Sequence, residues 1–217
     1  MTTWTWTNEP LEKFAADLDV RGKSVLSICA GGDMALTFLL NGAKFVDVFD
    51  KTIKARFDTE IKIATMRQYK KFDTVLRKMA AFDSAAKKVD ILKKNRVWNK
   101  ISPQMRALAE TWDSAGYNTP FGNGRRPFDE NIAHYKKIHK LVQGMSAPPL
   151  GEFIWRDLAG MSGVGKKYDV IYLSNIPEYG GFDWNAVMET LSPILPDGGQ
   201  VIGMSGNKFH IATKIRD

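Results

Sequence analysis

The chain has little of several features that mark particular classes of protein. Its 217 residues contain one cysteine, Cys29, so no disulfide can form within the chain and nothing points to an oxidising compartment. No apolar run approaches the length of a membrane-spanning helix, and the first residues, MTTWTWTNEP, lack the basic and apolar regions of a secretory signal. These absences predict a soluble, cytoplasmic protein without a transmembrane segment.

Metal and nucleophile signatures are also missing. His134 and His139 lie five apart without a glutamate partner or a nearby cysteine, and His210 stands alone. No Ser/His/Asp arrangement can be argued from the spacing either. We therefore predict packing or surface roles for the histidines and no metal site.

The charge is unevenly distributed. The formal net charge is +7, and between Lys51 and Arg106 basic residues outnumber acidic ones roughly three to one. No nucleic-acid-binding module, repeat or low-complexity tract accompanies this excess. The pattern predicts either an anionic partner, such as nucleic acid, a phospholipid surface or a phosphorylated small molecule, or simply a solvated helical face.

Residues 23–50 have the pattern of a strand, a turn, a helix and a second strand. Ser24–Cys29 is apolar like a buried strand, 30–33 is a turn of small residues, and Met34–Leu40 carries an apolar helical face. Phe45–Phe49 has the pattern of a second strand, and Asp50 ends it. The unit is therefore predicted to be βαβ.

Such a unit is suited to an adenosine-type cofactor. The turn consists of Ala30, Gly31, Gly32 and Asp33. Its small side chains let a ligand approach the backbone, and the free N–H groups that open the helix favour a carboxylate or a phosphate. Asp50, roughly twenty residues later, is placed to accept hydrogen bonds from ribose hydroxyls. The dinucleotide pattern G-x-G-x-x-G is not present, and Asp33 could equally cap the helix.

The middle of the chain, residues 52–150, has the pattern of a helical insertion or cap. Apolar residues recur at helical spacing over 53–64 and 72–89, and further helices are predicted at 103–112 and 127–142. Between the last two lies the loop 117–126, rich in glycine, asparagine and arginine. This loop is either an ordinary exposed turn or a lid that contacts an anionic group.

Strand signals return after the two prolines that close the insertion. Strands are predicted at Phe153–Trp155, Asp169–Leu173 and Gln200–Met204, with an edge strand at Phe209–Ile215 and a helix at Trp184–Leu195. Strands that alternate with helices predict an α/β fold, with a Rossmann-like, mostly parallel sheet and helices on both of its faces. We expect one domain over 1–217.

In such a sheet a ligand lies outside the carboxyl ends of the strands. The glycine turn, Asp50, Asp157 and the stretch Ser174–Tyr179 all follow predicted strands, so we expect them to converge on one crevice. Glu178 and Tyr179 are the best-placed candidates for proton or acceptor contacts, although loop surface and aromatic packing would explain them equally well.

The order of these features resembles the class I S-adenosylmethionine-dependent transferases. The resemblance rests on the glycine turn, the acid that ends the second strand, the acid after the third, and LPDGG before the fifth. More narrowly, VLSICAGGDMALTFLLNGAKFVDVFD followed by Glu60-Ile61-Lys62, and later DVIYLSNIPEY, resemble the betaine-lipid synthase family. That family transfers the 3-amino-3-carboxypropyl group of S-adenosylmethionine to diacylglycerol. The chain departs from it after Asp50, where it has KTIKA instead of an Asn-Pro and a Gln.

The resemblance implies S-adenosylmethionine as the cofactor and assigns roles by position. The predicted cofactor-binding residues are Ala30, Gly31, Gly32 and Asp33 for the methionine part, Asp50 for the ribose, Lys51 without an assigned part of the cofactor, Asp157 with Leu158 for the adenine, and Ser174 with Asn175 at the reacting centre. Asp157 could instead be a solvent-facing strand end.

Four activities follow as alternatives. The first is 3-amino-3-carboxypropyl transfer with methylthioadenosine as by-product, and the second is methyl transfer to nucleic acid, an amide or a small molecule. The third is lyase or cyclase chemistry on the cofactor, and the fourth is cofactor binding without catalysis. Residues 175–179 also resemble the Asn-Pro-Pro-Tyr turn of amino methyltransferases, although Ile176 and Glu178 interrupt it. The predicted catalytic residues are Asn175, from these resemblances, and Glu178 and Tyr179, from their position after the fourth strand.

Overall fold

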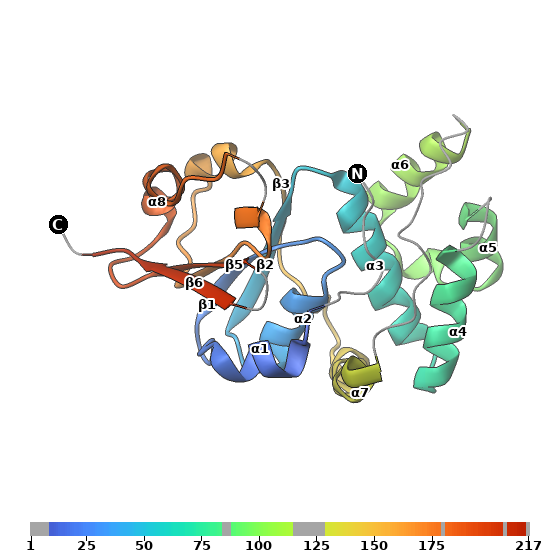
Figure 1. Cartoon of the computed structure of the whole chain (residues 1–217). Helices are drawn as coiled ribbons and strands as arrows, with labels where there is room; N and C mark the ends of the chain where they lie inside the picture. The colour runs from blue at the N-terminus through green and yellow to red at the C-terminus, as the bar shows by residue number, and fades with distance from the viewer. Residues whose placement is uncertain (1–8, 84–87, 115–128, 179–180, 206–207, 216–217) are drawn as a thin grey trace. The chain divides into compact units, whose positions relative to one another are not determined.

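The computed structural model describes residues 9–83, 88–114, 129–178, 181–205 and 208–215 (Figure 1). The chain divides into two compact units. We call them the helical unit, made of Met1–Phe14, Ala30–Asp33 and Ile53–Pro148, and the sheet unit, made of Ala15–Cys29, Met34–Thr52 and Pro149–Asp217. The helical unit therefore contains both the predicted insertion and the glycine turn. A single domain over 1–217 stays a prediction.

The sheet unit is built on six strands, and every predicted strand is confirmed. They are β1 Ser24–Ile28, β2 Phe45–Asp50, β3 Phe153–Trp155, β4 Val170–Tyr172, β5 Gln200–Ser205 and β6 Lys208–Thr213. Their order in the sheet is β3-β2-β1-β4-β5-β6, and all neighbours pair in parallel except β5 and β6. The predicted Rossmann-like, mostly parallel sheet is confirmed. The strand order runs from β1 to β3 on one side and from β4 to β6 on the other, so it reverses between β1 and β4.

Helices cover both faces of this sheet. Adjacent residues of β4 point to opposite faces. On one face the ring of Tyr172 packs edge-on against Phe38 of α2 (Asp33–Leu40), with ring centroids 5.3 Å apart. On the other, Ile171 joins a buried cluster with Leu191 of α8 (Trp184–Leu191). The helix predicted over 184–195 ends at Leu191, and a 3₁₀ turn, η4 (Ser192–Ile194), follows because Pro193 disfavours further α-helix.

Two polar clusters hold the strands in register at the amino-terminal side of the sheet. Asp169, next to β4, accepts hydrogen bonds from the backbone N–H and the hydroxyl of Ser24 in β1, at 2.8 and 2.7 Å. Asp47 of β2 is buried and accepts hydrogen bonds from Lys166 Nζ and the Tyr168 hydroxyl, at 3.0 and 2.9 Å. Burial, and then this hydrogen bond, raise the pKa of Tyr168 well above its usual range.

The helical unit follows the predicted insertion closely. Its helices are α3 Ile53–Gln68, α4 Phe72–Asp83, α5 Lys88–Lys94, the 3₁₀ turn η1 Trp98–Lys100, α6 Pro103–Ser114 and α7 Asp129–Gly144. The apolar pattern over 72–89 thus belongs to two helices and not to one. The predicted loop 117–126 and the first eight residues lie outside the described residues. A further helix, α1 (Leu11–Asp17), begins in this unit, where Asn131 of α7 accepts from the Leu11 N–H at 3.1 Å.

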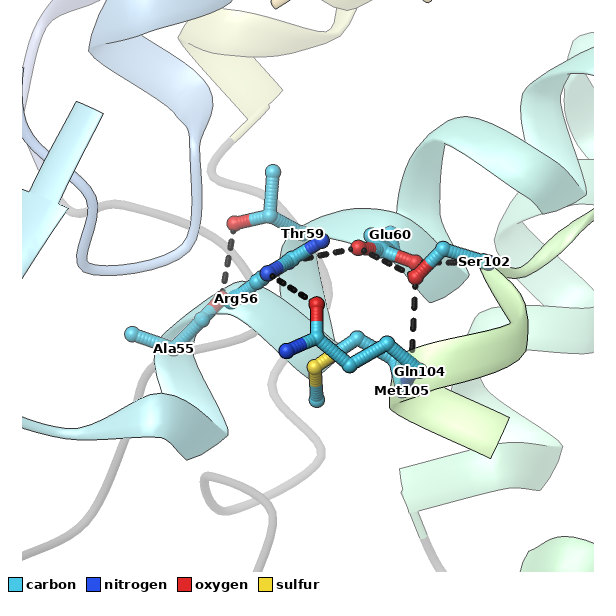
Figure 2. Close-up of polar contacts among 7 residues, drawn as sticks. All are labelled: Ala55, Arg56, Thr59, Glu60, Ser102, Gln104 and Met105. Atoms are coloured by element: carbon cyan, nitrogen blue, oxygen red, sulfur yellow. Dashed lines mark hydrogen bonds and ion pairs between the residues drawn. The ribbon is translucent and has the colours of Figure 1, made fainter. Parts of the chain in front are cut away.

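The helices of this unit are joined through α3. Figure 2 shows Glu60 of α3 at the start of α6, where its carboxylate accepts hydrogen bonds from the backbone N–H and the hydroxyl of Ser102 at 2.9 and 3.1 Å. Arg56 binds the same carboxylate at 2.8 Å and reaches Gln104 at 3.2 Å. Because Ser102 stands at the N-terminus of α6, this contact satisfies a backbone donor that the helix itself leaves unpaired.

Two absences can be stated for the described residues. No helix within the described ranges is long and apolar enough to cross a membrane. Over the same ranges, no group of three or more His, Cys, Asp and Glu side chains is placed to hold a metal ion. His139 has a structural contact instead, since its Nε2 lies 3.1 and 2.8 Å from the carbonyl oxygens of Met66 and Tyr69 at the end of α3.

Candidate cofactor site

The predicted cofactor residues of the sheet unit gather along one edge of the sheet. β1 to β5 are parallel, so their carboxyl ends share an edge, and the strand order reverses between β1 and β4. Six predicted residues follow strands at this edge: Asp50 and Lys51 after β2, Asp157 and Leu158 after β3, and Ser174 and Asn175 after β4. The Ala30–Asp33 turn follows β1 in the chain but packs in the helical unit, so its convergence with them stays a prediction.

Asp50 is the last residue of β2 and is half-buried. Its Oδ1 accepts a hydrogen bond from the backbone N–H of Thr52 at 2.8 Å. This local bond fixes the direction of the carboxylate, and a carboxylate has about four acceptor positions. Acceptance of ribose hydroxyls by Asp50 stays a prediction.

Trp155 is a candidate that the sequence reasoning missed. It is the residue of β3 that pairs with Asp50, and 63% of it is exposed. Its indole Nε1 donates a hydrogen bond to the carbonyl oxygen of Lys51 at 3.1 Å, which holds the ring beside the end of β2. An exposed, oriented aromatic ring is suited to stack on a base, and this one lies next to Asp50, for which ribose binding stays a prediction. The sequence feature that could have indicated this role is the position of Trp155, directly before Arg156 and Asp157 at the end of a strand.

Asp157 has a structural role that was not predicted. Its Oδ1 accepts a hydrogen bond from the backbone N–H of Gly160 at 3.0 Å, so it caps the 3₁₀ helix η2 (Leu158–Gly163). Leu158 packs against the buried cluster of the sheet. The cap fixes the chain after β3, and contact of either residue with an adenine ring stays a prediction.

The segment after β4 is held firmly by the backbone. Ser174 has a φ of 52°, and its carbonyl oxygen accepts a hydrogen bond from the Met204 N–H at 2.7 Å. Pro177, in the 3₁₀ turn η3 (Ile176–Glu178), covers Gly203 of β5, where an added Cβ would lie 2.5 Å from the proline ring. Asn175 and Glu178 are exposed beside it, and Tyr179 lies outside the described residues.

Left-handed backbone marks the ends of both strands at the reversal. Ala30 after β1 has a φ of 42° and Ser174 after β4 a φ of 52°, a region that side chains other than glycine rarely adopt. Non-glycine residues in this region cost of order 1–3 kcal/mol and cluster at functional sites. The two strand ends at the reversal point therefore both carry strain.

Lys62 is the second residue that the sequence reasoning missed. It lies on α3 with its side chain fully buried, and its Nζ is 2.7 Å from the Gly31 carbonyl oxygen and 2.5 Å from Asp33 Oδ1. Two roles were predicted for Asp33, a helix cap and a cofactor ligand. Asp33 is the first residue of α2, and the structure gives it a third role, as one partner of a buried ion pair. In the sequence Lys62 is one of several charged residues in a helical pattern, and no local feature pairs it with Asp33.

The same helix makes glycine necessary in the turn. Gly32 has a φ of 78°, and a Cβ at this position would lie 2.5 Å from Cγ2 of Thr59 on α3. Both the backbone conformation and the close approach of α3 exclude a larger residue. The turn therefore requires glycine at this position.

Comparison with solved structures finds distant similarities. A candidate S-adenosylmethionine-dependent methyltransferase from Streptococcus mutans has a TM-score of 0.44 and 10% identity, over 89% of this chain and 33% of that one. The rRNA methyltransferase aviRa from Streptomyces viridochromogenes, in a structure at 2.4 Å, has a TM-score of 0.41 and 11% identity, over 89% of this chain and 70% of that one. The chain thus spans about a third of the first protein. No family model and no curated protein matches the chain.

Proposed function

We propose that this chain binds S-adenosylmethionine and transfers one of its groups to an acceptor. The observation that carries the proposal is the pair Asp50 and Trp155, which lie opposite each other at the carboxyl ends of β2 and β3. Asp50 would accept hydrogen bonds from the ribose hydroxyls, and the exposed ring of Trp155 would stack on the adenine. Together they form a recognition site for an adenosine moiety.

For transfer from S-adenosylmethionine, the protein must mainly bind the two reactants and align them. Displacement at the sulfonium requires the nucleophile, the attacked carbon and the sulfur to lie nearly in line. Asn175 and Glu178 are exposed at the end of β4, next to the reversal point of the sheet. Asn175 would orient an acceptor through its amide, and Glu178 would take the proton from a hydroxyl or amine acceptor.

Two groups of S-adenosylmethionine are candidates for transfer, the aminocarboxypropyl group and the methyl group. Aminocarboxypropyl transfer was predicted from the resemblance to betaine-lipid synthase alone, and none of the comparisons supports that family. Methyl transfer is the activity in the descriptions of the similar structures. We therefore propose transfer from S-adenosylmethionine as the function and methyl transfer as the first reaction to test.

The nucleoside product separates these reactions. Purified protein is incubated with S-adenosylmethionine, with and without a cell extract, and the nucleoside is identified by mass spectrometry. S-adenosylhomocysteine would establish methyl transfer, whereas methylthioadenosine would establish attack on the γ-carbon. Methylthioadenosine without an acceptor would indicate lyase or cyclase chemistry. Tight binding without any turnover would overturn the transferase proposal in favour of a cofactor-binding subunit.

A further inference from the structure

The net positive charge of the chain resides in the helical unit. That unit contains 21 lysines and arginines against 12 aspartates and glutamates, a net charge of +9. The sheet unit contains 10 against 12, a net charge of −2. The excess of positive charge is therefore not spread over the whole chain. It belongs to the helical unit, most of which is inserted after β2.

Within this unit, three helices meet at a polar contact that includes Tyr69. Tyr69 follows the end of α3, and Asn95 follows the end of α5. The Tyr69 hydroxyl donates a hydrogen bond to the Asn95 carbonyl oxygen at 3.3 Å. Lys78 of α4 donates to the Asn95 side chain at 2.5 Å, and its Nζ lies 5.8 Å from the centre of the Tyr69 ring. The ends of α3 and α5 and the middle of α4 are thus brought together, in agreement with the adjacent helices in Figure 1.

Exposed cations flank each of these three residues in the sequence. We call them the Tyr69 basic surface, and they are Lys70, Lys71, Arg77, Lys94 and Arg96. Among the described residues of the unit, the ion pairs involve Arg56, Lys62, Lys93 and Lys137, and none involves a member of this surface. Arg96 also has a φ of 59°, a backbone conformation that arginine rarely adopts.

The chemistry of this surface is suited to nucleic acid. Peripheral membrane binding requires large apolar side chains that enter the lipid beside the basic ones, and every member of the Tyr69 basic surface is a lysine or an arginine. Lysine and arginine side chains are suited to bind phosphates, and a partly exposed tyrosine is suited to base stacking.

We propose that the helical unit binds nucleic acid through the Tyr69 basic surface. Binding itself does not depend on the cofactor. The step from bound partner to acceptor rests on the proposed function, and it makes nucleic acid the class of molecule that receives the transferred group.

The proposal is tested by fluorescence anisotropy of the full chain with labelled 20-nucleotide single-stranded RNA and a 20-base-pair DNA duplex, between 50 and 300 mM KCl. We expect the protein to bind at least one probe. The logarithm of the association constant should fall linearly with the logarithm of the KCl concentration. Replacing Lys70, Lys71, Arg77 and Arg96 with glutamine should weaken binding at 50 mM KCl at least tenfold. It should also reduce the salt slope by about 3, close to one for each phosphate that the variant no longer binds.

A matched variant separates a defined surface from net charge. Replacing Arg21, Lys44, Lys167 and Lys208 with glutamine removes four exposed charges from the sheet unit and should change the affinity less than threefold. Equal loss in the two variants, or no binding of either probe at 50 mM KCl, would overturn the proposal. Tighter binding to phosphatidylserine vesicles than to both probes, abolished in the first variant, would assign the surface to a membrane and also refute it.

Failure of this proposal is distinguishable from failure of the transferase. Both variants are titrated with S-adenosylmethionine by calorimetry, and both should bind it as the parent does. Loss of RNA or DNA binding with cofactor affinity retained locates nucleic acid recognition at the Tyr69 basic surface. Loss of both together in the first variant, but not in the second, would mean that the surface supports the fold, against the proposal.

Discussion

The ammonium of Lys62 lies 2.5 Å from the carboxylate of Asp33, with both side chains buried. The same ammonium bonds the carbonyl of Gly31, so a single side chain of α3 holds two residues of the glycine turn. A buried charge pair of this kind contributes little net stability but costs a great deal when one partner is removed. The pair is therefore a means of fixing the turn.

Removal of the lysine tests this account. Lys62→Met leaves the Asp33 carboxylate buried without its partner, so we expect a loss of about 3–5 kcal/mol in the free energy of unfolding, measured by urea denaturation. The double variant Lys62→Met with Asp33→Asn has no uncompensated charge and should recover most of that loss. If the double variant were no more stable than the single one, the ion pair would not be the reason for the effect.

Gly32 and Gly22 form a natural comparison. Both have a positive φ, 78° and 73°, but a Cβ on Gly32 would meet Thr59 whereas one on Gly22 has nothing within 4 Å. Gly22→Ala should cost about 1–2 kcal/mol from its backbone alone. Gly32→Ala should cost about 1–3 kcal/mol more because of overpacking, and Thr59→Ala should restore part of it. Equal thermal stability of the two alanine variants would contradict the close approach of α3.

The contact between Ser24 and Asp169 predicts a pH dependence. Hydrogen bonds from the side chain and then the backbone of Ser24 lower the pKa of Asp169. A lowered folded-state pKa gives stability that is present above the unfolded value, about 3.9, and is lost as the pH falls through the folded one. Ser24→Ala should therefore cost about 1–2 kcal/mol at pH 7, and the difference from the parent should shrink below about pH 4.

Ser27→Ala is the control for this experiment. Ser27 lies on the same strand, and its hydroxyl donates to the Ile28 carbonyl and not to a carboxylate. Its cost should be the same at pH 7 and at pH 3, by urea denaturation at both values. A Ser24→Ala cost that was equally independent of pH would show that the bond to Asp169 contributes nothing.

Trp155 should contribute to cofactor affinity and not to folding. Because it is largely exposed, Trp155→Ala should leave the melting temperature nearly unchanged, yet loss of stacking should weaken S-adenosylmethionine binding by about 1–3 kcal/mol. Trp155→Phe keeps a stacking surface and should retain most of the affinity. Calorimetric titration of the three proteins decides this, and unchanged affinity in Trp155→Ala would remove the residue from the site.

The sheet was predictable because its information is local. Each strand is a short apolar run bounded by turn residues, and Gly42, with a φ of 88°, follows the end of α2, where a left-handed glycine is common. The ends of the helices were less accessible. Pro193 stops α8 earlier than its apolar periodicity suggests, and one periodic pattern over 72–89 covers both α4 and α5.

The candidate site was predictable only in part. Asp50 and the glycine turn have recognisable positions relative to strands, whereas the contact between Lys62 and Asp33 joins residues 29 apart and has no local signal. Trp155 was missed because its significance depends on pairing with Asp50 across the sheet, between residues more than a hundred apart. Asp157 had only a general signal, since aspartate is favoured at the residue before a helix begins.

The central claim is that this chain binds S-adenosylmethionine through Asp50. The most direct test is calorimetric titration of the cofactor into the parent and into Asp50→Asn, with Glu189→Gln as a control because that exposed carboxylate is on α8 and is not a predicted site residue. The account predicts saturable binding to the parent and to Glu189→Gln, and affinity at least tenfold weaker in a folded Asp50→Asn. A parent that does not bind S-adenosylmethionine, or an Asp50→Asn variant with unchanged affinity, would contradict it.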